Sequence, residues 1–192
     1  RHGGRKRKRG NYKDSRGLIP NRVSIEKRPK IVERRKRFGD LEVDLIMGKG
    51  QKSALLVIVD RATLKITIDS LKCKNAKLVA TKILARLKKM PPIRTITFDN
   101  DQAFSLHELI AKKTKAKTFF TRPYSSQDKG TIENRNGVIR MFFPKKTDFL
   151  SIPVSKIKQA EREMNRRPIR KFGYLSANEL FSSMKGSVAL MS

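Results

Sequence analysis

Several residue types are scarce in this chain of 192 residues, and each scarcity excludes a class of protein. The single cysteine, Cys73, excludes an internal disulfide and a thiolate zinc site, and we interpret it as a half-buried packing residue. No apolar run has the roughly 20 residues that a membrane-spanning helix needs, and no secretory signal is visible. The sequence therefore favours an intracellular, cytoplasmic protein.

Acidic residues are also scarce, with 17 Asp and Glu against 46 Lys and Arg, which gives a formal net charge of +29. An imbalance of this size is typical of proteins that bind nucleic acid, because phosphates attract a basic surface. High solubility is the plainer explanation, and a membrane surface is the other partner that positive charge attracts. Membrane attachment would need an amphipathic helix with a broad apolar face, which the basic stretches lack.

The positive charge is densest in residues 1–38, which we interpret as a basic N-terminal arm or linker ahead of a core domain over residues 39–192. Glycine and proline recur in this arm and break regular elements, so we expect most of it to become ordered only on phosphate. Five consecutive basic residues near its start are candidates for contact with the nucleic-acid backbone: Arg5, Lys6, Arg7, Lys8 and Arg9.

The core reads as an α/β domain. Three strands come first, and two further strands are each reached through a helix, which predicts an antiparallel meander extended by two parallel strands in a mixed five-stranded sheet flanked by helices. The expected strands are 41–47, 53–60, 64–71, 93–98 and 116–121. The expected helices are 76–90, 102–113, about 128–142, 154–166 and 176–184, the first capped by Asn75 and the last by a capping box at Ser176 and Glu179.

Three acidic residues occupy places where these elements would present them together. Asp44 lies within the first strand, Asp99 ends the fourth, and Glu133 lies on the third expected helix, with 33 residues between the last two. Three carboxylates that converge repel one another unless a cation lies among them. Oxygen ligands of this kind suit two Mg²⁺ or Mn²⁺ ions, which can activate an attacking oxygen and stabilise a leaving one at a phosphate.

Each acid also has an ordinary explanation. Asp99 and Asn100 form a frequent turn pair, and Asp60 fits a turn residue or a partner of Arg61. Glu42 and Asp69 are interpreted as solvated strand residues. Because only the combination of the three acids in the right order of elements favours a metal site, the alternative explanations stay open at each position.

Two basic residues lie near Glu133 on the same expected helix. Arg140 follows Glu133 by two helical turns and so shares its face, from which it could hold a DNA phosphate in register. Lys129 stands near the helix start and is a further candidate for phosphate contact. An exposed charge serving solubility is an equally good explanation for both.

With these residues in view, the chain resembles bacterial insertion-sequence transposases of the DDE type, in the IS-thirty family. The resemblance rests on FGDLEVDLIMGKG, TITFDN, RPYSSQDKGTIENRNGVIRMFFPKKTDF and NRRPIRKFGYLSANELF, of which the last two are long and specific. It implies a ribonuclease-H-like integrase catalytic core, with Asp44, Asp99 and Glu133 as catalytic ligands of two Mg²⁺ ions and Arg140 as the basic residue beyond the glutamate.

The chemistry that the resemblance implies is hydrolytic cleavage at the ends of a DNA element, followed by attack of the freed 3′-hydroxyl on target DNA. It also implies a homo-oligomer on DNA at the bacterial nucleoid. The sequence departs from the family after Asp99, where Asp101 replaces a glycine and Ala103 an acid. Members usually begin with helix-turn-helix segments, so we expect this chain alone to bind DNA without sequence selection.

Two other functions stay open. One is a nucleic-acid-binding module without catalysis, such as a decayed transposase remnant, against which the intact set of three acids argues. The other is a simple ribonuclease-H-like nuclease without strand transfer, against which the basic arm and the C-terminal helices argue.

Overall fold

A mixed five-stranded sheet forms the centre of the protein in the computed structural model, which describes residues 19–122 and 130–189. The strand order is β3-β2-β1-β4-β5. β1 pairs antiparallel with β2 and parallel with β4, while β2–β3 is antiparallel and β4–β5 parallel, which confirms the predicted fold class. The strands are β1 (Asp40–Met47), β2 (Ala54–Asp60), β3 (Ile66–Leu71), β4 (Thr95–Phe98) and β5 (Lys117–Phe120).

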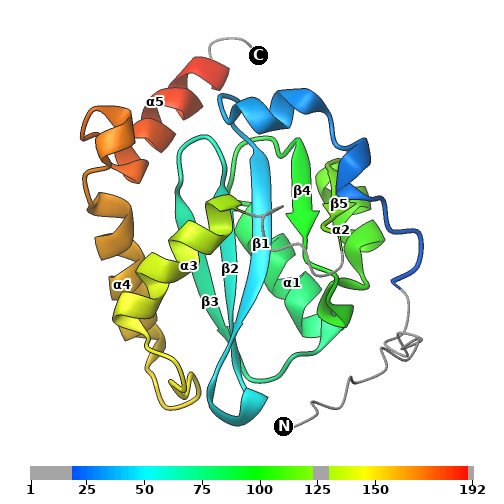
Figure 1. The fold of residues 1–192 in the computed structure, drawn as a ribbon, viewed down its shortest axis with the longest axis vertical. Coiled ribbons are helices and arrows are strands. Elements are labelled where there is room, and N and C mark those ends of the chain that lie inside the picture. The colour runs from blue at the N-terminus through cyan, green and yellow to red at the C-terminus, as the bar shows by residue number, and fades with distance from the viewer. Residues whose placement is uncertain (1–18, 123–129, 190–192) are drawn as a thin grey trace, which may run out of the picture.

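Helices cover both faces of this sheet (Figure 1). α1 and α2 pack against each other on one face, while α3 crosses β1 and β2 and α4 packs on β3 on the other. The helices are α1 (Ala76–Leu87), α2 (His107–Thr114), α3 (Gly130–Phe142), α4 (Val154–Arg166) and α5 (Ala177–Ala189). Short 3₁₀ turns lie before and between the strands and helices: η1 (Ile25–Lys27), η2 (Lys30–Arg34), η3 (Lys49–Gln51), η4 (Gln102–Phe104) and η6 (Arg170–Phe172).

Local sequence signals account for several element boundaries. The Asn75 side chain accepts from the backbone N–H of Lys77 at 2.9 Å and so caps α1 as expected. At α5 the predicted capping box is present, because the backbone N–H of Ser176 donates to Glu179 Oε2 at 2.7 Å. The helix expected over 102–113 differs, since Asp101 caps the 3₁₀ turn η4 and α2 begins only at His107.

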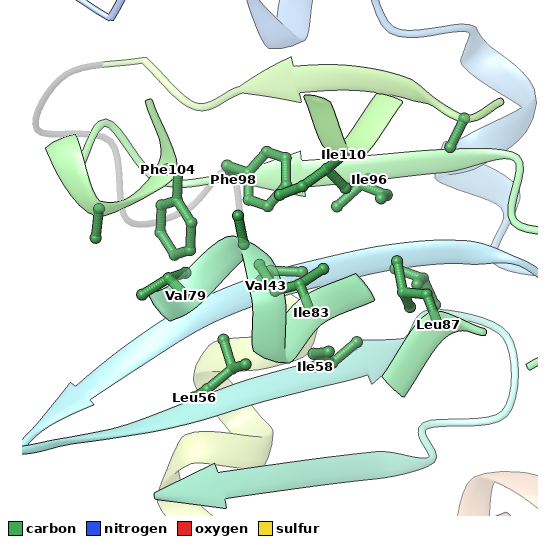
Figure 2. Packing of buried hydrophobic residues seen from close by; sticks show 14 of the residues in the cluster. Val43, Leu56, Ile58, Val79, Ile83, Leu87, Ile96, Phe98, Phe104 and Ile110 are labelled. Atoms are coloured by element: carbon green, nitrogen blue, oxygen red, sulfur yellow. The ribbon is translucent and has the colours of Figure 1, made fainter. Parts of the chain in front are cut away.

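The face toward α1 and α2 buries a hydrophobic cluster, as Figure 2 shows. Val43 from β1 and Leu56 and Ile58 from β2 meet the α1 side chains of Val79 and Ile83. These side chains are fully or almost fully buried, so their removal from water is a major source of stability. The face toward α3 and α4 holds a second cluster, in which Ile132 and Ile139 of α3 pack over β2.

Residues 19–38, the described part of the expected arm, run along the core. Ile19 and Val32 are buried, and the backbone N–H of Phe120 on β5 donates to Val23 O at 2.8 Å. The domain boundary at residue 38 stays a prediction. Cys73, interpreted as half-buried, is instead exposed, because it follows the end of β3 in a turn. In residues 19–122 and 130–189, no helix is long and apolar enough to cross a membrane.

Candidate active site

The parallel pairing of β1 with β4 brings together the strand that carries Asp44 and the strand that Asp99 follows. Asp40 lies opposite Thr95 and Glu42 opposite Thr97, where the paired register ends, and Asp99 comes directly after the last residue of β4. Val43 and Phe98, the residues before the two aspartates, face the α1 cluster. Because side chains alternate along a strand, Asp44 belongs to the face that α3 covers.

Helix α3 is attached to this face next to Asp44. Asn136 Nδ2 donates to Asp44 Oδ2 at 2.9 Å, which joins the helix to the middle of β1. Asn136 follows Glu133 by three residues, so it lies one turn further along the helix. The sequence analysis did not single out Asn136. The available signal was its spacing, because a residue three positions after the expected ligand Glu133 lies close to it on the helix surface.

Asp99 is held where β4 ends. Its Oδ1 accepts from the backbone N–H of Asn100 at 2.8 Å and from Thr121 Oγ1 at 3.1 Å. Asn100 in turn donates to the Thr121 carbonyl and accepts from Arg22 Nη1 at 2.7 Å. The turn expected at Asp99 and Asn100 is therefore held by hydrogen bonds to Thr121, just after β5, and to Arg22, in the segment that precedes the core.

Glu133 lies in the first turn of α3 and is exposed. Among the residues that the structure describes, no three acidic, histidine or cysteine side chains are grouped so that they could hold a metal ion. The structure thus pairs the strand of Asp44 with β4, which Asp99 follows, and attaches the helix of Glu133 next to Asp44. It does not bring the three carboxylates together, and their roles as ligands stay predictions.

Arg140, the expected phosphate contact, is bound to backbone carbonyls. Its Nη1 donates to Pro144 O at 3.2 Å and its Nη2 to Met47 O at 3.4 Å, so the guanidinium joins the end of α3 to the end of β1. Burial lowers the pKa of Arg140 from its usual value. Lys129 and the basic run Arg5–Arg9 lie outside the described residues, so all these DNA contacts stay predictions.

Arg135 adds positive charge to the inner side of α3. Burial lowers the pKa of its guanidinium, and the charge of Arg167 lowers it further. Within the described part of the chain, its buried Nε and Nη2 atoms have no hydrogen-bond partner. The face that carries the candidate site is therefore basic around its acidic centre.

Two acids interpreted as solvated are buried, so that interpretation was wrong. Glu42 is 0% exposed and accepts from Arg61, while Asp69 is 7% exposed and accepts from Arg86 of α1. Asp60 is a turn residue, as one of its two interpretations had it, because its Oδ1 accepts from the backbone N–H of Thr63 at 2.8 Å. Burial raises the pKa of Asp60 in spite of these hydrogen bonds.

Comparison with known proteins identifies relatives of one kind. The transposase for insertion sequence element IS4351 from Bacteroides fragilis is 45% identical over 195 residues, which cover 100% of this chain and 60% of the relative. The probable transposase for IS1161 from Streptococcus salivarius is 36% identical over 82% of this chain and 46% of its own length. Transposase InsI for IS30A from Escherichia coli is 28% identical over 94% of this chain and 47% of its own length.

The fold has a solved counterpart in the catalytic core domain of BIV integrase. The two structures agree with a TM-score of 0.63 over 79% of this chain and 98% of the integrase core, at 16% sequence identity. No protein-family model matches the chain. The curated relatives are matched over only about half to three-fifths of their length. The chain is therefore a homologue of insertion-sequence transposases, including those of the IS30 group, and it has the ribonuclease-H-like fold of an integrase catalytic core.

Proposed function

We propose that this chain is the catalytic core of a transposase that cleaves the ends of a DNA element and joins them to target DNA. The parallel pairing of β1 with β4 carries the proposal, because Asp44 lies on β1 and Asp99 directly follows β4. The hydrogen bond from Asn136 to Asp44 supports the assignment of Glu133 as the third ligand, since it attaches the helix of Glu133 at this point.

The donor set fits a divalent cation such as Mg²⁺ or Mn²⁺. Asp44, Asp99 and Glu133 offer only carboxylate oxygens, which these hard ions prefer. Within the described residues, the buried Oδ1 of Asn136 beside Asp44 has no hydrogen-bond partner, so a further oxygen acceptor stands next to the site. Among the described residues the three acids are not grouped closely enough to hold one ion, so they must come closer together before all three hold the same ions.

When bound, two such ions would activate the attacking oxygen and stabilise the leaving one. Water attacks the phosphodiester at the element end and releases a 3′-hydroxyl. That hydroxyl attacks a target phosphodiester, so one bond forms as another breaks and no covalent protein–DNA intermediate is needed. The carboxylates of the chain would hold the ions to which the scissile phosphate binds, with Arg140 and Lys129 as positioning contacts to neighbouring phosphates.

DNA is the partner that the net charge of +29 favours. We keep the division into a basic arm over residues 1–38 and a core over 39–192 as part of the proposal, with Arg5–Arg9 in contact with the DNA backbone. We also propose that the protein assembles as a homo-oligomer on DNA and acts in the cytoplasm, where bacterial DNA lies.

Strand transfer in vitro tests this function. A pre-cut DNA end is incubated with supercoiled plasmid and either Mg²⁺ or Mn²⁺, and joined products are separated on a gel. We expect joining that requires the metal and that Asp99→Asn abolishes while DNA affinity is kept, because the amide lacks the charge that holds the ion.

Each other outcome points to a different protein. Binding without joining at any metal concentration would favour a nucleic-acid-binding module. Metal-dependent cleavage without joining would favour a simple nuclease of the same fold. Joining that survives Asp99→Asn would move the site away from β4.

A further inference from the structure

A chain of charged side chains runs beneath the candidate site, mostly out of contact with water. It consists of Glu42 of β1, Arg61 after β2, and Arg28 and Glu33 from the segment before the core, and we call it the buried charge network. Glu42 is 0%, Arg61 2% and Arg28 8% exposed, whereas the Glu33 side chain remains 59% exposed. Arg61 donates to Glu42 and, at 3.1 Å, to Glu33, which also accepts from Arg28.

The network contacts the chain next to each of the three predicted ligands. Glu42 Oε2 accepts from the backbone N–H of Ile132 at 2.8 Å, immediately before Glu133. Arg28 Nη1 donates to Thr97 Oγ1 at 2.8 Å, two residues before Asp99. Glu42 itself stands two residues before Asp44 on the same face of β1. One set of side chains therefore joins the backbone supports of all three acids.

The hydrogen bond from the backbone N–H of Ile132 acts like a helix cap, but its acceptor, Glu42, lies on strand β1 and not at the start of α3. The first amides of a helix have no partner within the helix, and a negative charge close to them is favoured by the helix dipole. Glu42 supplies both an acceptor and a charge to the first turn of α3, while Arg61 neutralises the buried carboxylate. Apolar side chains of similar size would stabilise the interior about as well, so stability alone does not explain the charges.

We propose that Glu42 and Arg61 are positioning residues that anchor the first turn of α3, and with it Glu133, to β1. Glu33 extends this anchor to the segment before the core, because it accepts from both Arg61 and Arg28. The role of Glu133 rests on the proposed function, whereas the anchoring of α3 does not. The anchor matters for chemistry because Glu133 must lie at a set distance from the two aspartates to share their ions.

Hydrogen exchange on the free chain, without metal or DNA, tests the anchor directly. In the double variant Glu42→Met/Arg61→Met the pair is replaced by apolar side chains of similar size, so the fold is kept while Ile132 loses its acceptor. Amides in peptides covering 130–136 should exchange about tenfold faster, as expected for loss of a hydrogen bond to a charged group. Glu42→Gln retains a single acceptor oxygen where two are used, and its exchange should be intermediate.

Asp60→Asn is the matched control. Asp60 is also a buried carboxylate, at the end of the neighbouring strand, but it accepts from Gly39, Ala62 and Thr63 and not from α3. It should alter exchange around its own turn and leave 130–136 unchanged. Equal acceleration in the control and the double variant, or no acceleration in the double variant, would overturn the anchor.

Mn²⁺ binding to the free chain, followed by electron paramagnetic resonance, separates positioning from structure. The double variant should bind Mn²⁺ about tenfold more weakly, which is typical of losing a residue that orients a metal ligand. Faster exchange with unchanged Mn²⁺ affinity would reduce the network to a structural role. No Mn²⁺ binding by the unaltered chain would contradict the proposed function, and hydrogen exchange would still decide whether Glu42 anchors α3.

Discussion

The two faces of the central sheet use the same strands for different purposes. Toward α1 the middle of the sheet presents Val43, Ile96 and Phe98, all fully buried in an apolar cluster (Figure 2). Toward α3 the neighbouring positions of β1 are Glu42 and Asp44, and the apolar packing is confined mainly to β2 and β3. Because side chains alternate along a strand, each acid of β1 has sequence neighbours that pack in the apolar core on the opposite face.

This arrangement indicates how the candidate site is kept in place. The acids gain a rigid backbone from the apolar face, and the buried charge network contacts the chain close to each of them. Their own face is ordered by hydrogen bonds, such as those that join Asn136 to Asp44 and Thr121 to Asp99. Changes on the two faces should therefore affect different properties, stability on one and catalysis on the other.

Two adjacent substitutions, Asp99→Asn and Phe98→Ala, test this comparison most sharply. The first should affect catalysis and the second stability. Asp99→Asn should lower the rate of strand transfer by at least about a thousandfold, because it removes a ligand whose ions contribute several kcal/mol. Its free energy of unfolding in urea should stay close to that of the unaltered chain. A rate that falls only in proportion to a loss of folded protein would contradict the division between the faces.

Phe98→Ala should do the reverse. Phe98 is 0% exposed and stacks with Phe104 at 4.9 Å between ring centroids, so its truncation leaves a cavity in the apolar cluster. We expect a loss of about 3–5 kcal/mol in the free energy of unfolding. Strand transfer per folded molecule, measured at a temperature where the variant remains folded, should change far less than in Asp99→Asn.

Most of the fold follows from patterns visible in the sequence. Three strands followed by two helix-linked strands indicated the mixed sheet. The order of elements also favoured parallel pairing for the later strands, and β1 and β4 do pair in parallel. Asn75 and the Ser176 capping box marked helix starts, since caps are local signals.

The buried charges were out of reach of such reasoning. Glu42 and Asp69 looked solvated because the arginines that pair with them stand 19 and 17 residues away in sequence, in a turn and a helix. Periodicity reports which face a residue occupies, but not which remote side chain meets it there. The position of Glu133 was unpredictable for the same reason, because it depends on how α3 packs on the sheet. Its role as a ligand stays a prediction.

Substituting one exposed basic residue on each face of the sheet tests which face binds DNA. Arg167 is exposed near α3, and its charge acts on Arg135, whereas Lys113 is exposed on α2 at the opposite face. Arg167→Ala should reduce the slope of log affinity against log salt concentration by about one, as expected when one phosphate contact is lost. Lys113→Ala should leave the slope unchanged. Fluorescence anisotropy over a salt series measures both, and equal slopes in the two variants would remove DNA from the α3 face.

The smallest expected effect concerns Asp69, which links the two faces at the edge of the sheet. Burial by itself would raise the pKa of Asp69, but the hydrogen bond from Arg86 of α1 and the charges of Lys158 and Arg86 outweigh it. The pKa is therefore held below its usual value of 3.8. For a carboxyl with a lowered folded-state pKa, the stabilisation is complete above pH 3.8 and is lost as the pH falls through the folded value.

Asp69→Asn should therefore be less stable than the unaltered chain at pH 6, by under about 1 kcal/mol as for other partly exposed ion pairs, with a smaller difference at pH 3. Urea unfolding at the two pH values measures this, with the exposed Glu26→Gln as a control that should show no such convergence. A difference that stays constant between pH 6 and pH 3 would mean that Asp69 acts through packing. The helices on the two faces would then be held at this edge by packing around residue 69 and not by its ion pairs with Arg86 and Lys158.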